Sequence, residues 1–79
     1  MITKYDRWII KEIILKRVSK DDVVKLEQEM FKLKNKHPED FVFRIVHYAG
    51  DSTDFNIYVY NKKILKDRRF KELVIEHLL

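Results

Sequence analysis

The spacing of hydrophobic positions divides the chain into four segments. In residues 19–36 and 67–79, apolar side chains recur every three or four positions, the spacing of a helix with one buried face. In residues 41–60 they alternate with polar side chains, as in strands. With a further helix expected over residues 3–18, the sequence predicts one α+β domain over residues 1–79, in the order helix-helix-strand-strand-helix, with an antiparallel β-hairpin packed on the helices.

Residues 3–18 form the least regular of these segments. Thr3 and Asp6 are a plausible capping pair for a helix. At about 100° per residue, however, the apolar side chains do not form one stripe. They lie on several sides of the helix: Tyr5, Trp8, Ile9, Ile10, Ile13, Ile14 and Leu15. A helix this apolar needs a cover on a second face, from its own chain or from another. The isoleucines leave a strand as the alternative for part of this segment.

The two regular helices have clear boundaries. Ser19, followed by Asp22, predicts an N-cap with an acidic first turn, and His37-Pro38 ends the helix. Its inward stripe is Val23, Leu26, Met30 and Leu33, supported by Phe31. Asp67 is the expected N-cap of the last helix, whose inward stripe is Phe70, Leu73, Val74 and Leu78.

The hairpin is predicted to have one apolar and one aromatic face. The inner side holds Phe41, Phe43, Ile45, His47, Phe55, Ile57 and Val59, and the outer side holds Val42, Arg44, Val46, Tyr48, Tyr58 and Tyr60. Gly50, Asp51 and Asp54 supply the turn. Because two strands alone are marginally stable and their open edges invite pairing, we expect a homodimer.

Composition limits how this chain is stabilised and where it works. The chain has 79 residues, and the core of so small a domain supplies only about 3–5 kcal/mol of net stability. Without cysteine, neither a disulfide nor a thiolate zinc site adds to it. No secretory signal and no membrane-spanning run is recognisable, so we expect an intracellular, cytoplasmic protein. One Gly, one Ala and one Pro against many Lys and Ile indicate an AT-rich genome, such as that of a phage or a low-GC microbe. The net charge of +4 is therefore discounted as a sign of a polyanionic partner.

Aromatic and basic residues suggest a nucleic-acid site. A run of lysines and arginines over residues 62–71 begins where the tyrosine-bearing strand ends. Exposed rings stack on bases while cations neutralise phosphates. The candidate residues for binding RNA or DNA are Arg44, Tyr48, Tyr58, Tyr60, Lys62, Lys63, Lys66, Arg68 and Arg69. The alternative is structural, since tyrosine is common in strands and basic runs are often solvated faces. No RNP or helix-turn-helix motif accompanies the residues.

Catalysis has weaker support. His37, His47 and His77 lie on separate elements without metal-binding spacing. His47 is expected to be a near-core histidine, or else a general base beside Asp51. Asp51 and Asp54 are expected to form the turn, and a single glycine excludes a glycine-rich phosphate loop. We predict no catalytic residue, metal or cofactor.

Three hypotheses for function follow. The first is a nucleic-acid-binding regulator. The second is a protein-interaction module, such as a phage- or host-encoded inhibitor or adaptor, whose outer hairpin face meets a host protein. The third is a small ribonuclease, because Arg44, His47 and Tyr48 are residue types that such toxins use. A membrane-surface role is not expected, since the polar residues of segment 3–18 do not gather on one face.

Overall fold

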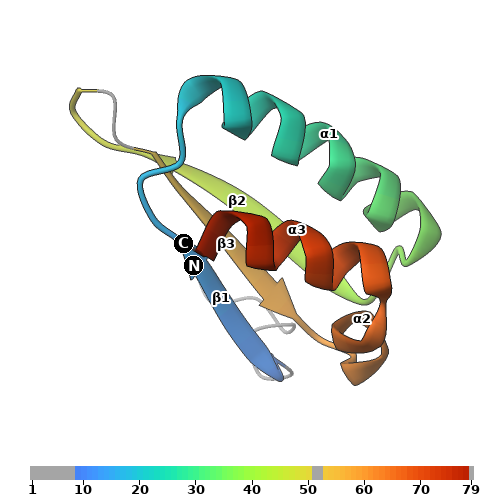
Figure 1. Ribbon diagram of the computed structural model, residues 1–79. Coiled ribbons are helices and arrows are strands. Elements are labelled where there is room, and N and C mark those ends of the chain that lie inside the picture. Colours follow the sequence, from blue (N-terminus) through green and yellow to red (C-terminus); the bar gives the residue numbers. More distant parts are fainter. Residues whose placement is uncertain (1–8, 51–52, 79) are drawn as a thin grey trace.

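In the part of the chain that the structure describes, a three-stranded sheet is combined with three helices. The computed structural model describes residues 9–50 and 53–78, without the side chains of residues 77 and 78 (Figure 1). The elements in order are β1 (Lys11–Leu15), α1 (Lys20–Lys36), β2 (Phe41–His47), β3 (Thr53–Val59), α2 (Lys62–Lys66) and α3 (Arg68–Leu78). The α+β class is confirmed. The predicted order helix-helix-strand-strand-helix is wrong, because the chain runs strand-helix-strand-strand-helix-helix.

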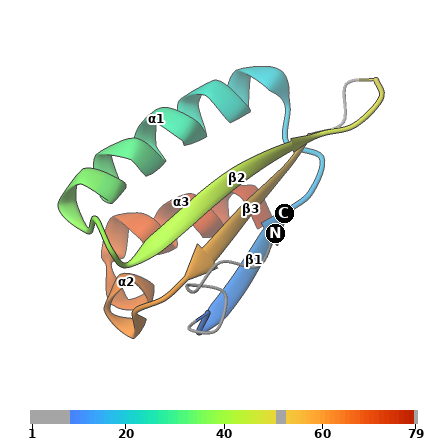
Figure 2. The same cartoon turned by 180° about the vertical axis from the view of Figure 1, so that it is seen from behind.

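The sheet has the order β1-β3-β2. Both outer strands pair antiparallel with β3, so they run parallel to each other on either side of it. The connection from β1 through α1 to β2 is therefore a split β-α-β unit. Figures 1 and 2 show the molecule from opposite sides, with α1 along β2 and both long helices on one face of the sheet. We call the opposite face the outer face.

Strand β1 stands where the second half of the first predicted helix was expected. Ile13 and Leu15 are buried in the core, whereas Ile14 between them is 42% exposed. This alternation is that of a strand. The central strand β3 offers a second row of backbone partners, and β-branched isoleucines fit a sheet better than a helix. Of the apolar side chains that suggested a second chain, Ile13 and Leu15 therefore lie on the inner face of a sheet and Ile14 lies on the other face. The predicted Thr3–Asp6 cap lies outside the described residues.

Helix α1 confirms the prediction for residues 19–36. The Ser19 hydroxyl accepts a hydrogen bond from the Asp22 backbone N–H at 3.3 Å, which caps the helix. The stripe of Val23, Leu26, Met30 and Leu33 is buried. Phe31 was wrongly assigned to the core, since it is 52% exposed. Phe31 lies beside the stripe, and its ring packs against Phe43 of the edge strand β2.

The hairpin confirms the predicted faces. In the β2–β3 register, Phe43 lies opposite Ile57 and Arg44 lies opposite Asn56. Phe41, Phe55, Ile57 and Val59 are fully buried. The prediction of a near-core His47 is wrong, because the end of the hairpin extends beyond the helices (Figure 1) and leaves this side chain exposed. Gly50 has φ 89°, a left-handed conformation that glycine adopts without strain.

Two helices close the chain. Helix α2 was not predicted, and Asn61 caps it by accepting the Lys63 N–H at 3.0 Å. The helix predicted over residues 67–79 corresponds to α3, and its predicted N-cap is confirmed. The Asp67 Oδ1 accepts the N–H groups of Arg69 at 2.9 Å and Phe70 at 3.2 Å. The buried residues of α2 and α3 join one core cluster with those of the sheet and α1: Ile64, Phe70, Leu73 and Val74.

Candidate functional site

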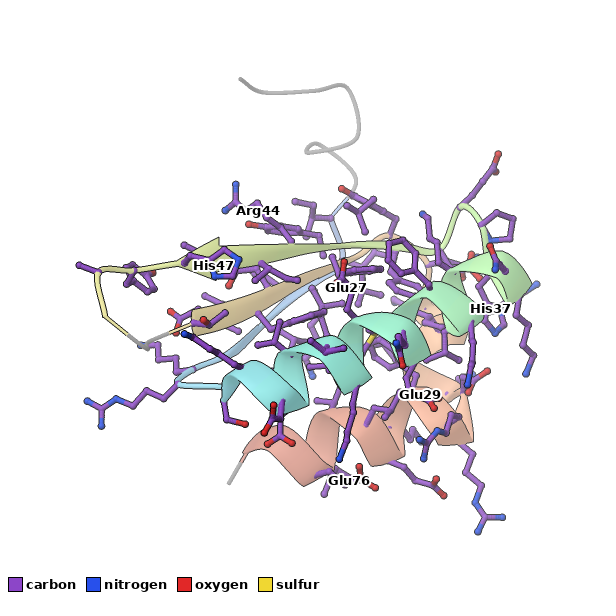
Figure 3. All side chains as sticks on the ribbon, turned by 90° about the horizontal axis from the view of Figure 1, so that it is seen from above. Glu27, Glu29, His37, Arg44, His47 and Glu76 are labelled. Atoms are coloured by element: carbon purple, nitrogen blue, oxygen red, sulfur yellow. The ribbon has the colours of Figure 1, made fainter. Side chains whose placement is uncertain are left out.

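The outer face holds part of the predicted nucleic-acid site. Arg44 on β2 and Tyr58 on β3 are diagonal neighbours in the register, the spacing at which long side chains meet. The Arg44 Nη2 donates a hydrogen bond to the Tyr58 hydroxyl at 3.0 Å. Its guanidinium carbon also lies 5.8 Å from the centre of the tyrosine ring. Arg44 points away from the helices in Figure 3, so the pair is presented on the outer face.

Tyr48 lies at the hairpin end of the same face and is 53% exposed. The neighbouring Asp54 carboxylate raises the pKa of the Tyr48 phenol, by its charge and by a side-chain hydrogen bond, while Arg44 partly offsets the effect. At the opposite end of β3, Tyr60 extends the pairing of β3 with β2 by one residue. Its N–H donates a hydrogen bond to the Asp40 carbonyl at 2.8 Å. The structure therefore places Arg44, Tyr48 and Tyr58 along one side of the hairpin, with the backbone of Tyr60 at its end.

The predicted basic residues divide into two groups. Lys62, Lys63 and Lys66 are exposed on α2, directly after the tyrosine-bearing strand. Arg68 and Arg69 instead lie in the helical layer and are engaged in ion pairs. Arg68 contacts Glu72 at 3.1 Å, and Arg69 contacts Glu29 and Glu72, each at 3.5 Å. The structure thus does not bring these two arginines to the outer face.

Acidic groups also lie on the outer face. Glu12 on β1 is directly opposite Tyr58 in the register, and Asp54 neighbours Tyr48. Arg44 is the only cation that strands β1–β3 supply to the centre of this face in the part of the chain that the structure describes. The electrostatic attraction for a polyanion therefore depends on Arg44 together with the lysines of α2.

Alternation along the strand places Asn56 on this face together with Tyr58, but it does not predict that Asn56 is buried. It lies in the central strand between the buried Phe55 and Ile57, and it is only 8% exposed. Its Oδ1 accepts no hydrogen bond from the described residues. An unpaired buried polar atom costs about 1–3 kcal/mol. The signal was an asparagine at an outward position of an otherwise apolar and aromatic strand, but its burial depends on neighbouring strands that the sequence does not reveal.

A second surface runs between α1 and the edge strand β2. A groove of about 380 Å³ is lined by Glu27, Phe31, Lys34, Val42, Phe43 and Ile45. The Phe31 ring packs edge-on against Phe43, with centroids 5.0 Å apart at an angle of 75°. Lys34 donates a hydrogen bond to the Phe41 carbonyl. Burial lowers the pKa of its ammonium group, and the negative charges of Asp40 and Glu39 partly offset this effect by raising the pKa. The exposure of Phe31 is the feature that sequence reasoning did not anticipate here.

The histidines show different surroundings. His37 bridges two carboxylates, with Nδ1 at 3.1 Å from Asp40 and Nε2 at 2.9 Å from Asp67. Burial alone would raise the pKa of Asp67, but hydrogen bonds from His37, from the Phe70 N–H and from Lys36 lower it to about 2. This cluster joins the end of α1 to the start of α3 and is structural.

His47 has one hydrogen-bond neighbour among the described residues, the Thr53 hydroxyl at 3.5 Å. The predicted partner Asp51 and the side chain of His77 lie outside the described residues. Over residues 9–50 and 53–78, no group of three or more histidine, aspartate or glutamate side chains is arranged to hold a metal ion. The described helices also include none with the length and apolar character needed to cross a membrane.

Comparisons with protein-family models, with curated proteins and with solved structures find no match for this chain.

Proposed function

We propose that this chain binds single-stranded nucleic acid, RNA or DNA, on the outer face of its sheet, and that it acts by binding rather than by catalysis. The observation that carries the proposal is the Arg44–Tyr58 pair on an antiparallel sheet. A guanidinium held beside an aromatic ring offers a flat surface on which a base stacks, and a charge for the adjoining phosphate. Antiparallel sheets with exposed aromatic side chains are a common platform for single strands.

The arrangement along β3 supports a binding path for several nucleotides. Tyr58 and Tyr60 point to the same side of the strand, since they are two residues apart. Asn61 then caps α2, so the exposed Lys62 and Lys63 follow the tyrosines directly. In this proposal the rings stack bases and Arg44, Lys62 and Lys63 contact phosphates. A cytoplasmic location, where single-stranded RNA is abundant, belongs to the same proposal.

Salt dependence gives the first test. For single strands, the slope of log binding constant against log salt is about −0.7 per neutralised phosphate. Three cations therefore predict a slope of about −2, measured by fluorescence anisotropy with labelled single-stranded RNA and DNA. Lys62→Ala should reduce the slope by about 0.7. Lys25→Ala, which removes an exposed lysine of α1, is the matched control and should leave the slope unchanged.

Stacking gives the second test. Tyr58→Ala should weaken binding by about 1–3 kcal/mol, the usual effect of removing one stacked ring. Arg44→Lys retains the charge but loses the planar group, so it should weaken binding while preserving the salt slope. The absence of salt-sensitive binding to either polymer at low ionic strength would remove this proposal.

A protein partner for the same face is the second candidate. It is favoured by Ile14 and Val42, which are 42% and 43% exposed on either side of β3. Apolar side chains beside tyrosines are typical of protein interfaces. In this case Tyr58→Ala and Tyr60→Ala should abolish the capture of one defined protein without unfolding the chain, and oligonucleotides should not compete. Competition by oligonucleotides would instead favour the nucleic-acid proposal.

A further inference from the structure

Strand β2 is the edge of the sheet on the side of α1, and its outward backbone groups can be assigned. The Asp40 carbonyl accepts the Tyr60 N–H at 2.8 Å, so these opposing residues form a hydrogen-bonded pair. Such pairs alternate along an antiparallel ladder. Val42, Arg44 and Val46 therefore bond to β3. The N–H and C=O groups of Phe41, Phe43, Ile45 and His47 point to the open edge.

The edge is bordered by apolar side chains. No described strand pairs with this side of β2. Phe31 projects from α1 beside it, and Val42 borders the same groove from the outer face. The Phe41 carbonyl in this row accepts from Lys34, and none of the row pairs with a described strand. Such an edge beside an apolar groove is a template for another strand.

The charges beside the edge identify the strand that fits. Helix α1 runs antiparallel to β2, as three contacts show. Lys34 reaches Phe41, Phe31 packs on Phe43, and Glu27 lines the groove beside Ile45. Figure 3 shows Glu27 on the side of α1 that faces β2. The edge therefore carries Lys34 at one end, with Glu39 and the His37-paired Asp40 nearby, an aromatic pair in the middle and Glu27 at the other end. This order is self-complementary under a two-fold rotation.

We propose that two copies of this chain form a symmetric dimer through antiparallel pairing of their β2 strands about Phe43. This register sets Phe41 of one copy opposite Ile45 of the other, so Lys34 of each copy meets Glu27 of its partner. The four rings of Phe31 and Phe43 meet at the axis. Lys34 turns from the Phe41 carbonyl to the partner's carboxylate. The sheet becomes continuous, with three strands from each copy.

Neighbouring registers are less favourable. An axis at Arg44 sets two guanidinium groups directly opposite each other, and like charges in that position destabilise a strand pair. An axis at Ile45 sets Glu27 against Glu27. The Phe43 register avoids both. This inference goes beyond the nucleic-acid proposal and does not depend on it, because it uses the edge of the sheet rather than the outer face.

A charge exchange tests the dimer. Sedimentation equilibrium should report a dimer for the unchanged chain. Glu27→Lys and Lys34→Glu should each raise the dissociation constant about tenfold or more, because each creates two like-charge contacts. An equimolar mixture of the two variants should form a heterodimer, since every contact then joins opposite charges. The double variant should dimerise by itself for the same reason.

Controls separate the edge from other surfaces. Lys25→Glu changes the net charge as Lys34→Glu does, but on the side of α1 that faces α3, and should leave the dimer intact. Phe31→Ala should weaken the dimer. Ile75→Ala, which shortens a side chain that is 61% exposed on α3, should not. Far-ultraviolet circular dichroism should show that each variant is folded.

Two results would overturn the inference. A monomer at concentrations of several hundred micromolar would mean that Lys34 guards the edge against pairing, as lysines on edge strands often do. A dimer that is insensitive to the exchange would place the interface elsewhere. Failure of the dimer leaves the salt-slope test of nucleic-acid binding unaffected, so the two proposals are refuted separately.

Discussion

Replacing Asp67 tests how one end of the molecule is held together. This carboxylate caps α3 through the N–H groups of Arg69 and Phe70, and it pairs with His37 and Lys36 at the end of α1. Its side chain is 9% exposed. A substitution therefore removes a helix cap and a link between two helices together.

The expected loss can be worked from these two roles. Loss of an N-cap costs about 1 kcal/mol. The pKa of Asp67, lowered from 3.8 to about 2, sets an upper bound of about 2 kcal/mol for its charged interactions. Because the paired Lys36 side chain is 68% exposed, screening by solvent reduces this contribution to about 1 kcal/mol. Asp67→Ala should thus lose about 2 kcal/mol, which lowers the melting temperature by roughly 8–16 °C in a chain of this size. Asp67→Asn keeps an acceptor oxygen and should lose about 1 kcal/mol.

The pH dependence separates charge from capping. Because the pKa of Asp67 is lower in the folded than in the unfolded chain, its charge stabilises the fold above about pH 4. This stabilisation is lost as the pH falls from about 4 to about 2. Urea denaturation at pH 6 should therefore show a gap of about 1 kcal/mol between the unchanged chain and Asp67→Asn, and the gap should close near pH 2.

Asp21→Asn is the matched control, because it removes an exposed carboxylate of α1 that has no capping role. Its effect should stay within about 0.5 kcal/mol. Two results would refute the role assigned to the ion pairs. One is an equal free energy of unfolding for the unchanged chain and Asp67→Asn at pH 6. The other is a difference between them that is the same at pH 6 and at pH 2.

Three further outcomes are expected. Ser19→Ala should lower the free energy of unfolding by about 1 kcal/mol, measured with urea, through loss of the α1 cap; an unchanged value would mean that the hydroxyl contributes nothing. Phe55→Ala, at a fully buried position of the central strand, should cost about 3–5 kcal/mol and leave little or no folded protein by circular dichroism; a well-folded variant would contradict the assigned core. Asp54→Asn should lower the pKa of Tyr48 in an ultraviolet titration, with Tyr48→Phe identifying its signal; an unmoved titration would show that Asp54 does not raise it.

Elements defined by local signals were predictable from the sequence. Helix α1 has its Ser19 cap and its apolar stripe within one segment, and the alternation in β2 and β3 placed Arg44 and Tyr58 on one face. Residues 11–15 lack such a signal. Five residues rich in isoleucine suit a helix or a strand, and the decision depends on a partner strand some 40 positions further along, as in the pairing of Leu15 with Phe55.

The candidate surfaces were predictable only in part. The alternation of side chains predicts which side of the hairpin carries the tyrosines. It does not predict which residues form ion pairs with the basic side chains. Arg69 meets Glu29 because α3 packs beside α1, and that packing depends on the whole fold. The same holds for Phe31, whose exposure is decided by where the sheet ends.

The position of β3 between β1 and β2 has a consequence for the order in which the chain folds. The hairpin closes over a few residues, whereas β1 must return across about forty, which costs about 2 kcal/mol more in chain entropy. We therefore expect β1 to dock last and its amide hydrogens to exchange with solvent before those of the hairpin. Until it docks, the central strand has a bare side lined with apolar residues, and that interval is when a newly made chain is most prone to aggregate.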